Sequence, residues 1–332
     1  MAGVDADGHN LAELLRASGY QFSGESPNME MISKLPQKVK ARVSALKANQ
    51  MKTIEIETNF YARVHELEKE MEAEFNKVYE ERRMIVSGEH EPNPAECTLP
   101  IFHGQAEEEI TEMNEKSEAD KGEKGIPEFW LTVLKTADNV ADLIEPHDEP
   151  ILKYLTDVTT VIDLEPAGFS LFFHFAPNPY FKNSVLTKKY TLQIAPDADE
   201  PFDYDGPSVE KCTGDKIQWN DGKDVTKKIV KKKQKKGSHA GKFLTKTVKS
   251  DSFFNFFDPP QITDEDHKNE ADEEDQETHE LLQADFELGQ VLRDHVIPRA
   301  VLFFTGEAAE GDAFDEEGED EDGDDFDEDD EE

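Results

Sequence analysis

Neither glycine nor proline occurs from Lys38 to Val86, a run of 49 residues bounded by Pro36 and Gly88. Apolar residues recur through this run with helical spacing, which predicts one continuous α-helix. At about 1.5 Å per residue the helix would be about 74 Å long. The rest of the chain can form a compact domain only about 50 Å across, so it cannot cover the whole helix. The simplest cover for the remainder is the same helix of a second chain.

The apolar residues of this predicted helix form a heptad-like seam, because most of them are three or four residues apart. We expect the seam to pair with its counterpart in a homodimer. The alternative, in which the long helix lies on its own domain, stays open. The residues predicted to make the dimer interface are Met51, Ile54, Phe60, Val64, Leu67, Met71, Phe75 and Val78.

The middle of the chain changes from helical to strand-like periodicity. After a loop region at residues 87–125, helices are predicted from Pro127 and over His147–Asp157. Apolar and polar residues then alternate in runs separated by turn-forming residues, which predicts an antiparallel meander of four strands. These runs are Val158–Leu164, Phe169–Phe175, Leu186–Ile194 and the short Lys216–Trp219.

The last third of the chain predicts a hairpin, an aromatic cluster and a final helix. Residues 223–249 contain eleven lysines and a central Gly237–Gly241 turn. Four phenylalanines at 253, 254, 256 and 257 must be largely buried. An amphipathic helix runs from Leu281 toward Pro298, and Ala300–Gly306 closes the fold. The predicted class is α+β, with a flexible arm (1–36), a dimerisation helix (37–88), a body (89–306) and a disordered acidic tail (307–332).

The formal net charge of −40 limits the partners of this chain. The tail from Glu307 to Glu332 has 18 acidic residues in 26 and no lysine or arginine, and the other 306 residues still carry −22. A second acidic stretch spans Asp264–Glu280, ten of 17 residues. Such a field repels nucleic acids and anionic membranes. We therefore expect strongly basic protein partners and no direct, specific DNA binding.

Residues typical of catalytic or metal sites show no matching pattern. There is no glycine-rich phosphate loop, no Gly-x-Ser-x-Gly turn, and no metal-ligand spacing of histidine and cysteine. Cys97 and Cys212 stand far apart, which fits a reducing compartment. The longest apolar stretch has about eight residues, whereas a membrane span needs about 20, and the N-terminus lacks signal-peptide features. We expect a soluble intracellular protein that is not an enzyme and binds no cofactor, metal or membrane.

The lysine-rich segment has two interpretations. Its densest part is typical of a nuclear import signal read by an import receptor. The same lysines could instead contact nucleic acid, although the surrounding acidic field opposes that. We favour import, and the residues concerned are Lys231, Lys232, Lys233, Lys235 and Lys236.

Five motifs, in the same order along the chain, resemble the nucleosome assembly protein family, in particular its nucleosome-assembly-protein-1-like branch. The resemblance runs from about Leu35 to the end. The motifs are GIPEFWLTVL at 125–134, PAGFSLFF at 166–173, NPYFKNSVLTK at 178–188, SFFNFFDPP at 252–260 and IPRAVLFFTG at 297–306.

The resemblance implies a histone chaperone. In that family the long helices pair antiparallel, an α+β body lies at each end, and the homodimer is dome-shaped. Acidic surfaces and tails hold core histones, chiefly the dimer of histones two-A and two-B and possibly histones three and four. They keep histones off non-nucleosomal DNA and promote nucleosome assembly. The family shuttles between nucleus and cytoplasm.

The residues expected to bind histones are acids from three segments. They are Asp148, Glu149, Asp264, Glu265, Asp266, Glu270, Asp272, Glu273, Glu274, Asp275, Glu277, Asp315, Glu316, Glu317, Glu319 and Asp320.

The alternative function is an acidic scaffold for other basic nuclear proteins, such as linker histone or transcription regulators. Competition between core histones and such a partner would distinguish the scaffold from the chaperone.

Overall fold

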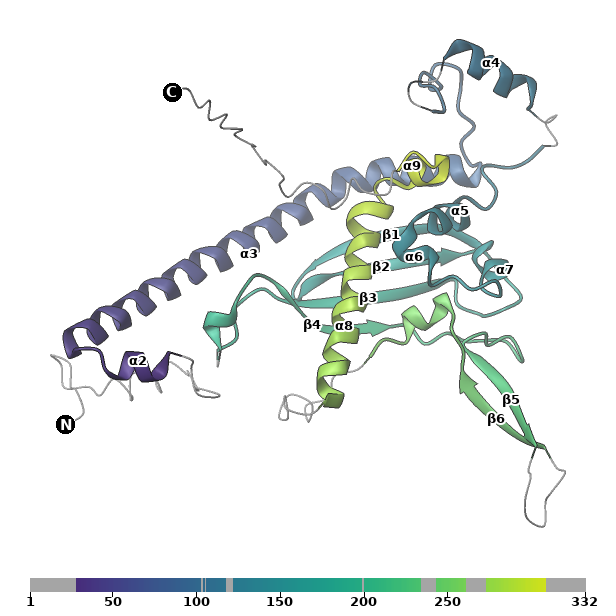
Figure 1. The fold of residues 1–332 in the computed structure, drawn as a ribbon. Coiled ribbons are helices and arrows are strands. Elements are labelled where there is room, and N and C mark those ends of the chain that lie inside the picture. The colour runs from purple at the N-terminus through teal and green to yellow at the C-terminus, as the bar shows by residue number, and fades with distance from the viewer. Residues whose placement is uncertain are drawn as a thin grey trace, which may run out of the picture.

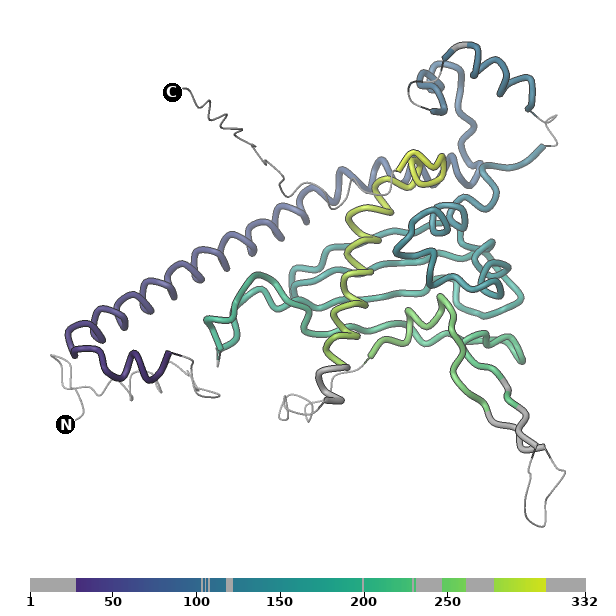
Figure 2. The backbone as a smooth tube through the Cα atoms, viewed as in Figure 1, coloured from purple at the N-terminus to yellow at the C-terminus, as the bar shows by residue number. Residues whose placement is uncertain are grey.

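A computed structural model describes residues 28–102, 104, 106–117, 122–198, 200–233, 243–260 and 273–308 (Figures 1 and 2). Its dominant element is helix α3, Gln37–Ser87, which has 51 residues. The short helix α2, Met29–Ser33, precedes it. Pro36 lies directly before α3, and Gly88 ends it in the left-handed conformation at φ +68°. In Figure 1 the N-terminal half of α3 extends well beyond the sheet.

Four short helices follow α3. They are α4, Glu107–Glu115; α5, Phe129–Thr136; α6, Asp138–Ala141; and α7, Glu149–Leu152. The predicted helix over His147–Asp157 was wrong beyond Leu152, because strand β1 begins at Leu155. Leu155, Thr156 and Asp157 alternate between buried and exposed. The β-branched residues that follow favour a strand over another helical turn.

The body contains an antiparallel sheet of four strands in the order β1-β2-β3-β4, which confirms the predicted α+β class and meander. The strands are β1, Leu155–Leu164; β2, Ala167–Phe175; β3, Val185–Gln193; and β4, Ser208–Gly214. The prediction of the fourth strand at 216–219 was wrong, since Trp219 makes only an isolated bridge with Phe181. Strand β4 was missed because it is an edge strand with one fully buried side chain, Cys212.

One face of the sheet carries the hydrophobic core. Helices α8, Glu273–Val291, and α5–α7 lie across this face in Figure 1. A π-helical turn, η4, Leu292–Val296, and helix α9, Ala300–Thr305, continue from α8. The aromatic cluster forms a 3₁₀ turn, η2, Phe253–Phe257, and its four phenylalanines are buried as predicted. Helix α8 approaches β3 so closely that a Cβ on Gly289 would lie 2.4 Å from the Tyr190 ring.

A buried lysine joins three of these elements. Lys188 of β3 is fully buried, and its Nζ lies 2.6 Å from Asp285 Oδ2 of α8. The same ammonium donates to the main-chain oxygen of Phe256 and lies 4.4 Å from that ring's centroid. Removing a buried charge's partner is strongly destabilising, so this pair fixes α8 and η2 on the sheet.

The lysine-rich hairpin is a separate two-stranded sheet. Strand β5, Lys227–Lys233, pairs with β6, Phe243–Lys249, as predicted. Figure 1 shows the hairpin projecting away from the four-stranded sheet.

Candidate functional site

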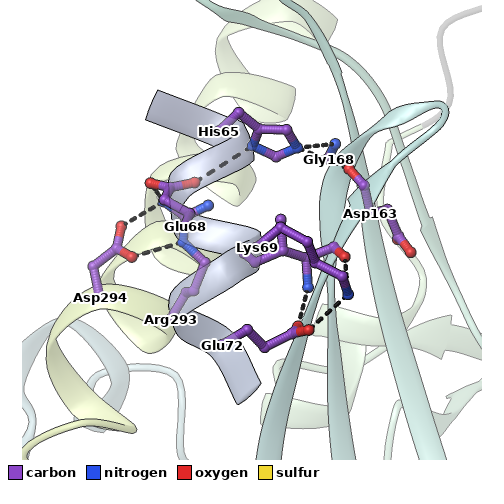
Figure 3. Close-up of polar contacts among 9 residues, drawn as sticks. His65, Glu68, Lys69, Glu72, Asp163, Gly168, Arg293 and Asp294 are labelled. Atoms are coloured by element: carbon purple, nitrogen blue, oxygen red, sulfur yellow. Dashed lines mark hydrogen bonds and ion pairs between the residues drawn. The ribbon is translucent and has the colours of Figure 1, made fainter. Parts of the chain in front are cut away.

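The inner face of α3 is fixed to the free edge of the sheet (Figure 3). Glu72 Oε1 accepts a hydrogen bond from the Ile162 main-chain N–H, and Lys69 Nζ donates to the Ile162 carbonyl at 2.8 Å. His65 Nε2 lies 2.8 Å from the Asp163 carbonyl oxygen. These side chains satisfy backbone groups that an edge strand would otherwise leave open. The helix is thereby held with its opposite face directed away from the body.

A second set of contacts joins α3 to the π-helical turn η4. The Arg293 guanidinium lies 4.6 Å from the Phe169 ring centroid and 2.6 Å from Asp294 Oδ1. It also lies 3.7 Å from Glu68 of α3. This arginine is mostly buried, so its charge pairs lose less to solvent screening than exposed pairs do. The rotation of α3 relative to the body is therefore fixed by two sets of contacts within residues 65–72 of the helix.

The outer face of α3 is an exposed apolar stripe. The predicted seam residues Phe60, Leu67, Met71, Phe75 and Val78 are 45–60 % exposed in the single chain. Val64, between them, is partly buried. Contiguous apolar surface of this kind is typical of a protein interface. The stripe remains our predicted dimer interface.

Two residues predicted for the seam lie off this stripe. Ile54 is only 2 % exposed and is buried within its own chain. At about 100° per residue, Ile54 lies about 120° and Met51 about 180° around the helix from Phe60. The spacing of three or four residues breaks between Ile54 and Phe60, and that break was the signal. Leu46 and Ile56, which fall on the stripe by the same phase, were missed and are 65 % and 69 % exposed.

A groove extends the stripe onto the body. It has a volume of about 460 Å³ and lies between α3, β1 and the turn after η4. Met71, Phe75 and Tyr79 line one wall, and Thr160 and Pro298 line the other. The Thr160 hydroxyl is buried without a hydrogen-bond partner. An interface on this side would therefore include part of the sheet as well as the helix.

Asp148, predicted to contact histones, is instead a core residue, so that prediction was wrong. Its carboxylate is fully buried and accepts hydrogen bonds from Ser252 Oγ and the Phe253 N–H, both at 2.7 Å. It also accepts from the Glu145 N–H at 3.0 Å. The sequence showed an acid beside another acid, and only the fold shows that this carboxylate holds η2.

Another acid of the body is also structural. Asp157 is buried, and burial raises the pKa of its carboxyl to about 6, an effect that the nearby Arg82 guanidinium only partly offsets. Arg82 itself lies over Trp130, 5.1 Å from the ring centroid. Some acidic side chains of the body are thus buried within the fold and are not exposed to a partner.

The remaining acidic candidates fall into three groups. Glu149 is partly exposed and pairs with Lys135 at 2.7 Å, so it is reachable but not free. Glu273, Glu274, Asp275 and Glu277 lie in the first turns of α8. The candidates from Asp264 to Asp272 and from Asp315 to Asp320 lie outside the described residues and stay predictions. Lys231, Lys232 and Lys233 lie in β5, whereas Lys235 and Lys236 lie outside the described residues.

The structure adds two acids that the sequence reading missed, Glu287 and Asp294. With Glu280, the end of the predicted acidic stretch, they recur every seven residues and are exposed along α8 and η4. Glu287 and Asp294 line a hollow of about 710 Å³ together with Asn139, Gln283 and Gln290. The seven-residue spacing was visible in the sequence, but the acids looked like ordinary solvated positions.

Two other kinds of feature are absent from the described residues. They contain no group of three or more histidine, cysteine or acidic side chains that could hold a metal ion. Within the same residues, no helix has the length and apolar character needed to cross a membrane.

Comparison with known proteins agrees with this arrangement. The family model of the nucleosome assembly proteins matches residues 41–307. The chain belongs to the nucleosome assembly protein family. That match spans most of the long helix, the sheet, the hairpin and α9, and it contains all five motifs, so the predicted family is confirmed.

Individual members of the family are similar over most of their length. Nucleosome assembly protein 1-like 1 of Xenopus tropicalis is 44 % identical over 300 residues, covering 86 % of this chain and 74 % of that protein. Human nucleosome assembly protein 1-like 1 is 45 % identical over 293 residues, covering 85 % and 73 %. Nucleosome assembly protein 1 from Plasmodium knowlesi superposes with a TM-score of 0.50 at 29 % identity, covering 82 % of this chain and 99 % of that chain.

Proposed function

We propose that this chain is a homodimeric histone chaperone. It binds core histones, chiefly the dimer of histones two-A and two-B and possibly histones three and four. It shields them from non-nucleosomal DNA and promotes nucleosome assembly. The observation that carries the proposal is the 44–45 % identity to nucleosome assembly proteins over about 290–300 residues.

The charge of the chain supports binding to histones. A net charge of −40 favours encounter with a strongly cationic partner and makes the encounter fast and salt-sensitive. Histone lysines and arginines would pair with the exposed acids of α8 and with the tail. The same contacts compete with non-nucleosomal DNA for the histones. They need not be strong enough to remove histones from a completed nucleosome.

The spacing of the stripe on α3 supports an antiparallel dimer. A two-fold interface requires a self-complementary surface, so each apolar residue should face one that mirrors it across the axis. Leu46 with Val78, Ile56 with Met71, and Phe60 with Leu67 all mirror each other about a point near residue 63. The two-fold axis of the proposed dimer therefore passes near Val64. This pairing would put one body at each end of the helices, and we propose that the dimer is dome-shaped.

Localisation is part of the same proposal. The lysines of the hairpin would be read by an import receptor, and the protein would shuttle between cytoplasm and nucleus. The hairpin projects from the body in Figure 1, where a receptor could reach it.

Removing the tail tests whether its charge contributes to histone binding. A chain ending at Gly306 should bind the dimer of histones two-A and two-B about tenfold more weakly, because it loses a tethered second site. Its affinity should also depend less on salt, since fewer ion pairs remain to be screened. The measurement is a fluorescence titration with labelled histone dimer at several salt concentrations.

A matched control keeps the tail but removes part of its charge. The full chain with asparagine and glutamine in place of the acids at 315–320 should fall between the other two. Equal affinity for all three chains would move the binding site to the body and contradict the role given to the tail.

A further inference from the structure

The β5–β6 hairpin is poorly stabilised by its own contacts. It is a sheet of only two strands, and no other described element packs extensively along it. Such an isolated ribbon is marginally stable in water. Its described side chains are mainly exposed, including Val230, which is 42 % exposed. The hairpin therefore lacks the apolar backing that holds the four-stranded sheet.

Like charges face each other across the hairpin. Lys227 and Lys249 are directly opposite partners, and Lys228 is paired with Val248 one step further. Like charges directly opposite are destabilising. Lys227 pairs with Asp224 at 2.9 Å, but Lys228 and Lys249 form no ion pair with any described residue. The geometry thus presents a cationic ribbon on which at least Lys228 and Lys249 are uncompensated by any described residue.

A polyanionic segment of the same chain begins within reach. The described chain ends at Ala308, two residues after Gly306 closes α9. Another 24 residues follow, and 17 of them are acidic. Fully extended, 24 residues span about 80 Å, comparable with the roughly 76 Å of α3. In Figure 1 the four-stranded sheet lies between α9 and the hairpin, and neighbouring strands are only about 4.8 Å apart.

We propose that residues 309–332 dock on the β5–β6 hairpin in the free protein. The tail neutralises the lysines that the fold leaves unpaired, and the hairpin relieves the self-repulsion of the tail. Tethering gives the tail an effective concentration of about millimolar, whereas a free nucleic acid must first overcome the net charge of −40. The contact hides the lysines until a strongly basic partner draws the tail away.

Energy transfer between two dyes measures this contact without any histone. Thr247→Cys in β6 and Gly323→Cys in the tail provide the labels and leave every acid and lysine in place. Cys97 is exposed and is replaced by serine, while Cys212 is buried. Trace doubly labelled chain is mixed with excess unlabelled chain, so that each assembly holds one labelled copy.

We expect high transfer at low salt and a large loss at about 1 M salt, where the Debye length is about 3 Å. Lys228→Gln, Lys246→Gln and Lys249→Gln together should cause the same loss at low salt. Lys38→Gln, Lys52→Gln and Lys77→Gln together, on exposed positions of α3, should leave transfer unchanged. Poly-lysine should lower transfer by capturing the tail.

Circular dichroism of both triple variants should match that of the parent chain. Transfer that is insensitive to salt and to the hairpin substitutions would overturn the proposal, as would an equal loss in the α3 control. Displacement of the tail by duplex DNA at low concentration would assign the hairpin to nucleic acid instead. Since no histone is present, failure of the proposed chaperone function would leave this result unaffected.

Discussion

A chain carrying both Val64→Glu and Leu67→Glu should be monomeric. Both positions lie on the outer stripe of α3, close to the proposed two-fold axis, so a dimer would bury four new carboxylates near one another. Burying uncompensated charge costs several kcal/mol. We expect a loss of about 4 kcal/mol or more, which is about a thousandfold in the dimer dissociation constant. Light scattering coupled to size exclusion measures the mass directly.

The control places the same two charges elsewhere on the helix. Ala48→Glu and Ala73→Glu occupy exposed positions about 120° and 140° around α3 from Phe60. That variant should remain a dimer with unchanged helix content. A dimer that survives Val64→Glu and Leu67→Glu would refute the interface.

Asp148→Ala should destabilise the body by about 3–5 kcal/mol. Three donors point at this carboxylate: the Ser252 hydroxyl, the Phe253 N–H and the Glu145 N–H. Each buried donor left without a partner costs about 1–3 kcal/mol, and the loss also frees η2 from the sheet. Chemical denaturation measures the free energy of unfolding.

Two comparisons separate this structural role from a binding role. Glu149→Ala removes a partly exposed pair with Lys135 and should change stability by no more than about 1 kcal/mol. Asp148→Asn retains one acceptor oxygen and should cost less than Asp148→Ala. Histone affinity measured where Asp148→Ala is still folded should be unchanged. A fully stable Asp148→Ala chain that binds histones weakly would restore Asp148 to the binding site.

Sequence periodicity predicted the elements that have clear boundary residues or a regular alternation of apolar and polar residues. Pro36 and Gly88 bound α3, and the alternation from Val158 onward located β1 to β3. The aromatic cluster was predicted to be buried because four phenylalanines have no other favourable place. The family motifs cover most of β2, the start of β3 and the aromatic cluster, whereas α3 and β1 were predicted from periodicity alone.

The errors arose where tertiary contacts override local pattern. Strand β4 lies at an edge and buries fully only Cys212, so no alternation marked it. Ile54 has the chemistry of a seam residue but the wrong helical phase. Asp148 resembles any surface acid until the hydrogen bonds to Ser252 and Phe253 are seen. Composition identifies charge, but only geometry separates structural acids from exposed ones.

The most direct test of the chaperone assignment is the binding of the full chain to the purified dimer of histones two-A and two-B. The titration is done at physiological and at high salt, with light scattering on the same samples. We predict tight binding that weakens steeply as salt rises, by a particle containing two copies of this chain. A chain that leaves the histones unbound at physiological salt, or that binds them as a monomer, would contradict a dimeric histone chaperone.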